Sequence, residues 1–271
     1  GKYNIGDIGI SSYSNDNISR VKFSSEFAEG SYTGTGSLQK FVKDFSSVTL
    51  RKELPSMFRD TVSTWKGEKY DLAFRCHDTM DLLSFLAPGL YIADSSFLRM
   101  SIDTSGLFKA RLNSQRIAFK DQYIKDIDCT FSNCGGILDG ELNSESIRIA
   151  TLMLMNNRID LFADNDHLGL GFSYDNESTL TNRGEFFATG DVTRDDNGKM
   201  KLDISLLPSS IYLNSREWSI APSKFSIKGK EINVENIGFN SGDQTIRIYG
   251  ATSDKTREKL VVSMERFDIS I

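Results

Sequence analysis

The stretch "WSIAPSKFSIKGKEINVENIGFNSGDQTIRIYG", which runs from Trp218 to Gly250, decides the fold class. Apolar residues occupy every second position in it, with Ile232 and Val234 in one run and Ile246 and Ile248 in another. This period of two is typical of β-strands, which then have one apolar and one polar face. The spacers between the runs are too short to hold a helix, so the question is what covers the apolar face.

The same period continues through most of the chain from Leu90 onward. We predict strands over 97–102, 107–112, 116–119, 123–131, 137–142, 146–155, 158–162, 168–174, 184–192, 199–206, 210–213, 217–220, 224–227, 231–239, 244–249, 259–264 and 266–271. Asn197-Gly198 is a strong signal for a two-residue hairpin. Because parallel crossovers usually need a helix, neighbouring strands should pair antiparallel, in sequence order, as a long meander. The apolar alternation slips at Asn236, which indicates a β-bulge.

The first third of the chain has a different pattern. Residues 1–36 contain short strand-like runs, and the region 37–89 is predicted to be a helical segment. In that segment Leu38, Phe41 and Phe45 recur at helical spacing after Ser37, a plausible N-cap. A further short helix is expected within "SMFRDTVSTW" (56–65). Another is expected to begin after a capping Asp78, with Asp81 as in a capping box, and to end at Pro88-Gly89. The predicted organisation is therefore 1–36, 37–89 and a curled sheet over 90–271.

Composition excludes several classes of protein. The chain has 271 residues, with 39% apolar and 25% charged residues and a formal net charge of −5. This acidic balance argues against a broad nucleic-acid surface. No apolar run is long enough to span a bilayer as a helix. The turn-rich "GSYTGTG" (30–36) lacks the Lys-Ser/Thr end of a phosphate-binding loop.

The sequence contains no constellation that indicates metal binding or catalysis. His77 and His167 lie in different regions, and we interpret them as capping or solvent-exposed side chains. "DNDH" (164–167) and "DDNG" (195–198) are read as turns because neither has the complete spacing of a calcium loop. We therefore expect no cofactor, no metal and no enzymatic activity.

The cysteine count leaves one question open. Three cysteines occur, Cys76, Cys129 and Cys134, and their spacing matches no zinc site. Cys129 and Cys134 flank a predicted turn and would be able to pair in an oxidising compartment. The other reading is that the cysteines are small buried hydrophobes.

The apolar face of so many strands is too large to be left in water. A soluble monomer rarely exposes an apolar patch above about 300–600 Å². The sheet can close into a barrel, fold on itself as a sandwich, or roll into a half-open trough whose apolar lining meets lipid chains. The uniformly short connections favour one continuous, curled sheet. In a trough, the residues predicted to line it are Leu168, Leu170, Phe172, Met200, Leu202, Ile204, Leu206, Phe225, Ile227, Ile232, Val234, Ile246 and Ile248.

The C-terminal half resembles the TamB domain of the AsmA-like proteins of Gram-negative envelopes. The resemblance rests on "LLPSSIYLNSREWSIAPSKFSIKGKEINVENIGFNSGDQTIRIYGATSDKTREKLVVSMERFDI" (206–269), with Trp218, Pro222, Gly238 and Gly250 as fixed points. Upstream, "LLSFLAPGLYIADSSFLRMSID" (82–103) is similar to the entry of the repeats in that family. The likeness covers about two-thirds of the chain, and the helical stretches at 37–65 and 78–87 depart from it.

The resemblance implies a mainly β protein whose long antiparallel meander is curled into a half-open β-taco trough. It also implies a periplasmic segment of a larger protein, anchored in the inner membrane through a part outside this sequence. Phospholipid acyl chains would be the cargo, on their way to the outer membrane. An outer-membrane barrel protein of the assembly machinery would be a further partner.

Two other functions remain open from the sequence. A β-sandwich or solenoid could act as a glycan-binding or adhesive module, with Trp218 or Tyr249 exposed on the polar face as the platform for sugars. A carbohydrate-active β enzyme would need an acidic cleft, whose geometry the sequence does not give.

Overall fold

The computed structural model describes residues 7–15, 18–58, 65–150, 152–177, 181–213, 215–252 and 259–266, with no side-chain description for 46–48. Strands make up 64% of the chain and helices 8%, which confirms the prediction of a mainly β fold built as an antiparallel meander. Two compact units are present, Gly1–Lys52 with Asp60–Asn157 (unit 1) and Glu53–Arg59 with Arg158–Ile271 (unit 2). Among the described residues, no helix has the length and apolar character needed to cross a bilayer.

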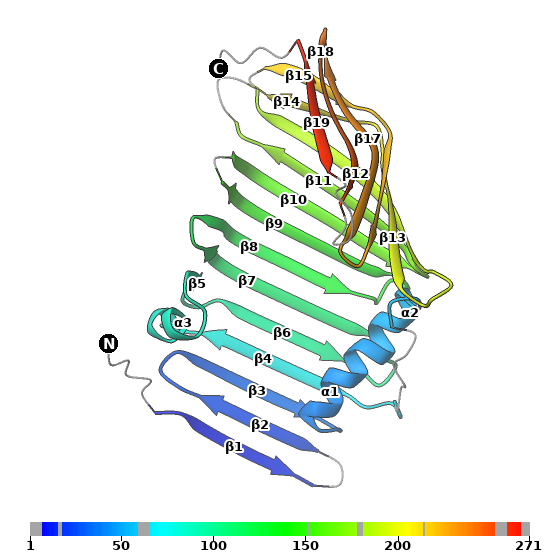
Figure 1. Ribbon diagram of the computed structural model, residues 1–271. Coiled ribbons are helices and arrows are strands. Elements are labelled where there is room, and N and C mark those ends of the chain that lie inside the picture. Colours follow the sequence, from blue (N-terminus) through cyan, green and yellow to red (C-terminus); the bar gives the residue numbers. More distant parts are fainter. Residues whose placement is uncertain are drawn as a thin grey trace. The chain divides into compact units, whose positions relative to one another are not determined.

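The elements are shown in Figure 1. The strands are β1 (Gly9–Ser14), β2 (Ser19–Ser24), β3 (Ala28–Gly34), β4 (Tyr70–Cys76), β5 (Leu90–Ile92), β6 (Phe97–Ile102), β7 (Phe108–Phe119), β8 (Gln122–Ser132), β9 (Leu138–Ile149), β10 (Leu152–Asp164), β11 (His167–Asp175), β12 (Arg183–Arg194), β13 (Met200–Leu206), β14 (Ser209–Leu213), β15 (Arg216–Ile220), β16 (Ser223–Lys228), β17 (Glu231–Ser241), β18 (Gln244–Thr252) and β19 (Leu260–Glu265). The helical elements are α1 (Leu38–Asp44), a π-helical continuation η1 (Phe45–Leu50), α2 (Arg51–Glu53) and α3 (Met80–Leu86).

The structure of unit 1 shows that the predicted helical segment 37–89 is not wholly helical. Residues 37–89 also contain the strand β4, which pairs antiparallel with both β3 and β6 and so joins the N-terminal strands to the rest of the sheet. Its alternating Tyr70, Leu72 and Phe74 are the period-two signal that the neighbouring helices obscured. The helix further along begins one residue later than expected, with Thr79 rather than Asp78 at the N-cap. Most of the predicted helix at 56–65 lies outside the described residues.

Ser37 confirms its predicted role at the start of α1, because its side chain accepts a hydrogen bond from the Lys40 amide at 3.1 Å. The helical run continues through η1 and α2, and Pro55 follows it closely. Figure 1 shows α1 crossing the unit 1 strands near one of their ends, whereas α3 lies at the other end.

Unit 2 is a meander with one nested region. Strand β13 pairs with β12 and with β16, while β14 pairs with the first residues of β12 and with β15. Strand β17 in turn pairs with both β15 and β16. Pro208 separates β13 from β14, and Pro222 separates β15 from β16. Because proline has no amide hydrogen to donate, each long strand is interrupted there, and pairing in strict sequence order is lost.

Other boundaries follow the alternation. The slip at Asn236 is a bulge as predicted, with the β17–β18 register shifting between Val234 and Ile237. The predicted strand 146–155 is wrong, because β9 ends at Ile149 and β10 begins at Leu152. Ala150 takes a positive φ of 53° there, and no glycine, asparagine or proline marks the turn.

The cysteines are free thiols, so the possible Cys129–Cys134 disulfide is absent. Cys76 and Cys129 are buried, whereas Cys134 is exposed. Burial raises the pKa of the Cys76 and Cys129 thiols, and nearby acidic side chains add to the shift. Both residues therefore behave as buried apolar side chains.

We predict that iodoacetamide modifies the native protein at Cys134 much faster than at Cys76 or Cys129, because the reactive thiolate is disfavoured by burial. Intact-mass analysis followed by peptide mapping measures the three rates. Unfolding in denaturant supplies the control, in which all three thiols react. A native mass lower by two hydrogens, with Cys129 and Cys134 both protected, would contradict the free-thiol assignment.

Candidate functional site

The register of unit 2 places all thirteen predicted lining residues on one face of its sheet. Directly paired residues in an antiparallel sheet point to the same side. Leu168 pairs with Gly190, which pairs with Ile204. Ile204 then pairs with Phe225, and Phe225 with Val234. The bulge in β17 keeps the alternation in phase, so Ile246 and Ile248 of β18 share this face. We call it the unit 2 apolar face.

This face is only partly covered. Of the thirteen residues, Val234 alone is buried, and it exposes 6% of its surface. Leu170 and Met200 each expose 43%, and the other ten are half-buried. A close-packed second layer would bury such side chains almost completely. The unit 2 apolar face is therefore a surface that solvent or a ligand reaches.

One part of the same face is closed by its own side chains. Trp218, Ile211 and Ile220 are buried together, and Phe186, Phe239 and Ile246 pack against them. The interpretation of Trp218 as an exposed residue on the polar face is therefore wrong. It exposes only 6%, and it pairs with Ile211 on the apolar side. Tyr249 does lie on the polar face and exposes 42%.

The polar face of unit 2 carries charges and, besides Tyr249, the exposed aromatic rings of Phe162 and Phe187. Lys201 and Asp203 form an ion pair at 2.7 Å, and Lys228 and Asp195 form another at 2.7 Å. The ring of Phe162 covers Gly169, where a β-carbon would collide with it, and the ring of Phe187 lies against Gly171. These rings fill the space above the two glycines, which explains their presence without a ligand.

Unit 1 has its own apolar face, which sequence reasoning missed. One row across it runs from Ile10 through Phe23, Gly30, Phe74 and Leu98 to Leu112. Ile10 exposes 71% and Phe74 exposes 40%. The alternation of Leu98, Met100 and Ile102 in the predicted strand 97–102 is the signal that would have extended the lining into this unit.

The helix α1 and its continuation cover one end of the unit 1 apolar face. The ring of Phe41 packs edge-on against Tyr70, with centroids 5.4 Å apart, and Phe45 packs against Phe108 at 4.9 Å. Tyr70, Ile102 and Phe108 expose 3% or less beneath them. The row that contains Phe74 and Leu98 lies farther along the strands and stays partly exposed.

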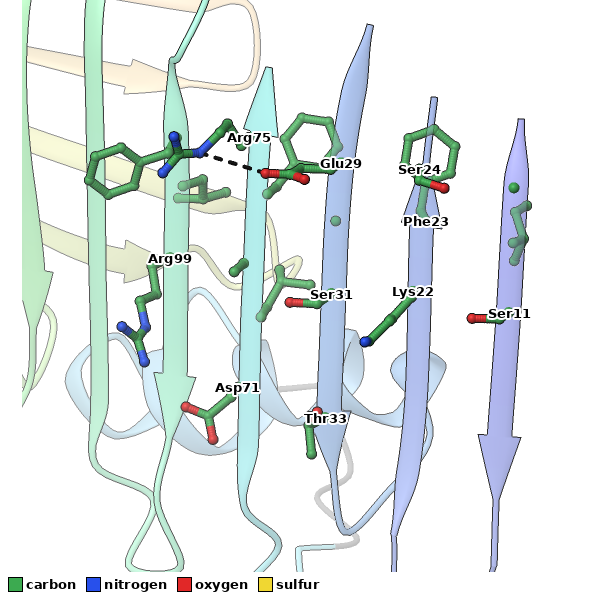
Figure 2. Close-up of a pocket in the computed structure, with 18 residues that line it drawn as sticks. Ser11, Lys22, Phe23, Ser24, Glu29, Ser31, Thr33, Asp71, Arg75 and Arg99 are labelled. Atoms are coloured by element: carbon green, nitrogen blue, oxygen red, sulfur yellow. Dashed lines mark ion pairs between the residues drawn. The ribbon is translucent and has the colours of Figure 1, made fainter. Parts of the chain in front are cut away.

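A third feature of unit 1 is a cavity of about 930 Å³ on the polar face of β1 to β4 and β6 (Figure 2). Its floor includes the small residues Ser31 and Ala73, and Lys22 and Arg99 lie on either side of them in one register row. The nearby ion pair between Arg75 and Glu29 is 3.8 Å long, and both side chains are more than half exposed. Such a solvated, mixed-charge surface selects no single ligand class. The two apolar faces are therefore the stronger candidate site.

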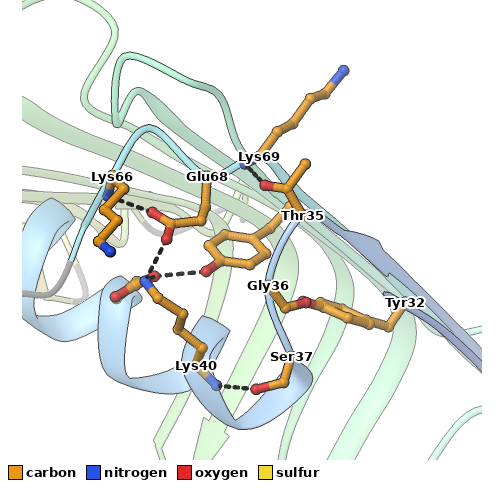
Figure 3. Close-up of polar contacts among 10 residues, drawn as sticks. Tyr32, Thr35, Gly36, Ser37, Lys40, Lys66, Glu68 and Lys69 are labelled. Atoms are coloured by element: carbon orange, nitrogen blue, oxygen red, sulfur yellow. Dashed lines mark hydrogen bonds and ion pairs between the residues drawn. The ribbon is translucent and has the colours of Figure 1, made fainter. Parts of the chain in front are cut away.

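A buried polar cluster fixes α1 to the sheet (Figure 3). The Asp44 carboxylate exposes only 1%, and its Oδ2 accepts hydrogen bonds from the Lys40 ammonium and the Tyr70 hydroxyl, each at 2.6 Å. Lys40 also forms a 2.9 Å ion pair with Glu68. Tyr32 donates its hydroxyl to the carbonyl of Gly36, where the chain enters α1. A buried carboxylate needs such donors, so this cluster determines where the covering helix lies.

The pKa values in this cluster follow from burial and charge. Burial, followed by the hydrogen bond to Asp44, raises the pKa of Tyr70, and burial raises the pKa of Tyr32 to about 12. Burial alone would lower the pKa of Lys40, but its bonds to Asp44 and Glu68 outweigh that effect and raise it. Burial alone would raise the pKa of Glu68, but hydrogen bonds from the Lys66 amide and Lys40 outweigh it and lower the pKa.

The histidines and turn acids show no metal centre. Among the described residues, no group of three His, Cys, Asp or Glu side chains is placed to hold a metal ion. His167 begins β11 rather than lying in a turn, and it contacts Asp191. His77 lies 3.9 Å from the Glu29 carboxylate.

No protein-family model, curated protein or solved structure matches this chain. The resemblance to the TamB domain therefore rests on the sequence pattern.

We predict that Tyr70→Phe lowers the free energy of unfolding by about 1–3 kcal/mol, because the buried Asp44 carboxylate loses one of the two donors that it has among the described residues. Urea unfolding followed by circular dichroism measures the change. Tyr91→Phe removes a more exposed hydroxyl and is the matched control, with an expected effect within about 0.5 kcal/mol. Equal, small effects of the two substitutions would show that the Tyr70 hydroxyl does not hold the helix.

The lowered pKa of Glu68 makes part of the folding stability sensitive to acid. A carboxyl whose folded pKa is depressed stabilises the protein above its unfolded value, here 4.5, and loses that contribution as the pH falls through the folded value. We expect wild type to be more stable than Glu68→Gln near neutral pH, with the difference shrinking as the pH falls from about 4.5 through the lower pKa of the folded state. Denaturant titrations at several pH values measure it. Glu26→Gln, at an exposed site, is the control, and a wild-type advantage that is constant with pH would contradict the linkage.

Proposed function

We propose that this protein shields the acyl chains of phospholipids against its apolar sheet faces, as a non-enzymatic, periplasmic segment of a TamB/AsmA-like protein. In this proposal it serves phospholipid transport between the inner and outer membranes, and an outer-membrane barrel protein is a further partner. The observation that supports it most is the unit 2 apolar face, where thirteen apolar side chains share one side of the sheet and twelve of them are not buried.

The energetics of such a site are favourable. Each buried methylene contributes about 0.8 kcal/mol, so one acyl chain of roughly sixteen carbons gains on the order of 10 kcal/mol before the costs of association. The rows of the unit 2 apolar face present similar aliphatic side chains on successive strands, such as Leu202, Ile227 and Ile232. A chain that moves from one strand to the next exchanges one aliphatic contact for another. The free energy therefore changes little along the face, as a conduit requires.

The charge distribution also supports the proposal. The opposite side of the same strands carries Lys201, Asp203 and Lys228, which stay in water. Lipid head groups would remain solvated at the open side of the apolar face, with no need for a specific pocket. No residue is proposed as catalytic.

The glycan-binding alternative loses much of its support. Sugars stack on exposed aromatic rings, but Trp218 is buried in the apolar cluster. Phe162 and Phe187 are exposed, yet they pack over glycines of the neighbouring strand. Tyr249 remains the one residue named for this function that is exposed on the polar face.

We predict that Ile248→Asp lowers the amount of co-purifying phospholipid about ten-fold or more, because a carboxylate on the apolar face would lose its hydration when an acyl chain covers it. Mass spectrometry of organic extracts from the purified protein gives the ratio of lipid to protein. Circular dichroism should be unchanged, since Ile248 is only half-buried.

Tyr249→Asp is the matched control, because it places the same charge on the adjacent, polar side. It should leave the lipid content as in wild type. Equal lipid content in the Ile248→Asp protein would overturn the proposal. Glycan retention by wild type that Tyr249→Asp abolishes would support the alternative instead.

A further inference from the structure

The last strand of the unit 2 sheet is a regular strand that pairs on one side only. Among the described strands, β19 pairs with β18 and with no other strand. Its six residues match β18 one for one, from Leu260 opposite Gly250 to Glu265 opposite Thr245, without a bulge. β19 contains no proline, and its only charged residue is the last one. Prolines, bulges and central charges usually protect an open edge, so this edge is free to pair with another strand.

The hydrogen-bonding pattern shows which backbone groups face the open edge. Ser241 and Gln244 flank the two-residue turn between β17 and β18, so their backbone groups bond to each other. Bonded pairs alternate along an antiparallel ladder. Every second residue of β18 from Gln244 onward therefore bonds to β17, and the residues between them bond to β19. In β19 this alternation directs the backbone N–H and C=O groups of Leu260, Val262 and Met264 to the open edge.

The side chains of the same three residues extend the unit 2 apolar face. Val262 pairs with Ile248, and Met264 pairs with Ile246, so they lie on the same side as those residues. Leu260, Val262 and Met264 expose 40%, 55% and 58% of their surface. An incoming strand would therefore meet unpaired backbone groups and an apolar row at the same residues.

The segment from Lys259 to Glu265 is complementary to a second copy of itself. If two copies pair antiparallel about Val262, that residue opposes its own counterpart and Leu260 opposes Met264. On the polar side, Lys259 of each copy then opposes Glu265 of the other, so opposite charges meet at both ends of the pairing. No like charges face each other, and the apolar rows stay on one side. These matches favour a second copy of the chain as the partner of this edge.

The open edge of unit 1 lacks this complementarity. Among the described strands, β1 pairs only with β2, and in the turn between them the Asn15 amide donates to the Ile18 carbonyl at 3.0 Å. By the same alternation, Ile10, Ser12 and Ser14 direct their backbone groups to the open edge of β1. Only one of these three is apolar, and β1 contains no charged residue. The edge of β1 is therefore a suitable internal control for pairing through β19.

We propose that two copies of this chain associate through β19, about a two-fold axis at Val262, and join their unit 2 sheets into one antiparallel sheet. Such an isologous contact closes on itself, so assembly stops at the dimer. The unit 2 apolar faces of the two copies would form one continuous surface. Two paired strands of this length bury less than the roughly 1,200–2,000 Å² of a standard interface, so the dimer should be weak and concentration-dependent.

This inference goes beyond the proposed function, because it concerns the backbone edge of β19 and not the lipid on the sheet face. Sedimentation velocity of the full chain over a wide range of concentrations tests it. Wild type should reach an equilibrium between monomer and dimer, with no larger species.

A proline at the open edge is the first variant. Val262→Pro removes an edge amide but leaves the bonds between β18 and β19, so it should raise the dissociation constant of the dimer about ten-fold or more. Ser12→Pro is the matched control, because it removes an edge amide from β1, and it should dimerise as wild type does. Circular dichroism checks that both variants fold.

An exchange of charges tests the register without changing the backbone. Glu265→Lys places lysines opposite each other at both ends of the contact and should weaken the dimer. Lys259→Glu in the same chain should restore it, because each pair then carries the two charges in reverse. Failure of the second substitution to restore the dimer would overturn the proposed pairing.

Three further results would also overturn the inference: a monomeric wild type at every concentration, an unchanged dimer of the Val262→Pro protein, or a dimer that Ser12→Pro abolishes. The last would assign self-association to the edge of unit 1. Lipid content is measured separately by mass spectrometry. Loss of the dimer with the lipid content unchanged therefore leaves the proposed function standing.

Discussion

The whole structure depends on how a sheet with one apolar face keeps that face from water. In unit 1 the cover is a helix, and Phe41 and Phe45 seal the row that contains Tyr70 and Phe108. In unit 2 the cover is a cluster around Trp218, built from the sheet itself. Each cover closes only part of its face. The remaining aliphatic side chains project from strands whose backbone groups are already hydrogen-bonded to each other. The strands therefore stay paired even where these side chains are not buried. That division between backbone pairing and side-chain burial leaves room for an apolar guest.

The polar cluster under α1 shows how the extent of the cover is determined. Asp44 is almost fully buried, and its carboxylate is tolerated because Lys40 and Tyr70 bind it. This geometry places the helix over one end of the strands, and the row from Phe23 to Leu112 remains beyond its reach. A purely apolar helix would be free to slide farther over the face. The buried Asp44 carboxylate thus fixes the position of α1 on the sheet, at some cost in stability. The part of the unit 1 apolar face beside α1 stays uncovered as a result.

Alternation in the sequence predicted most strands and the shared side of thirteen apolar residues in unit 2, because a period of two fixes which side chains share a side. It did not predict the cluster of Ile211, Trp218 and Ile220 on the same face. The prediction failed where the local sequence carried no turn or strand signal. The turn at Ala150 has none of the usual turn residues, and β4 was hidden between helices. Trp218, a candidate for a sugar platform on the polar face, lies on the apolar face instead, because an aromatic residue suits either side of a strand. The nested pairing of β13 with β16 depends on prolines whose effect on distant strands only the fold reveals. The position of α1 over the unit 1 sheet depends on contacts between residues far apart in the sequence, such as Tyr70 with Asp44. No local sequence pattern encodes such a contact.

The central claim is that apolar guests lie on the unit 2 apolar face. Photocrosslinking with a phospholipid that carries a diazirine at the end of its acyl chain tests it most directly. Adducts mapped by tandem mass spectrometry should fall on apolar-face residues of β11, β13 and β16 to β18, such as Leu170, Ile204 and Ile232. Adducts confined to the polar face, or a labelling yield no higher than that of a soluble control protein, would contradict the account.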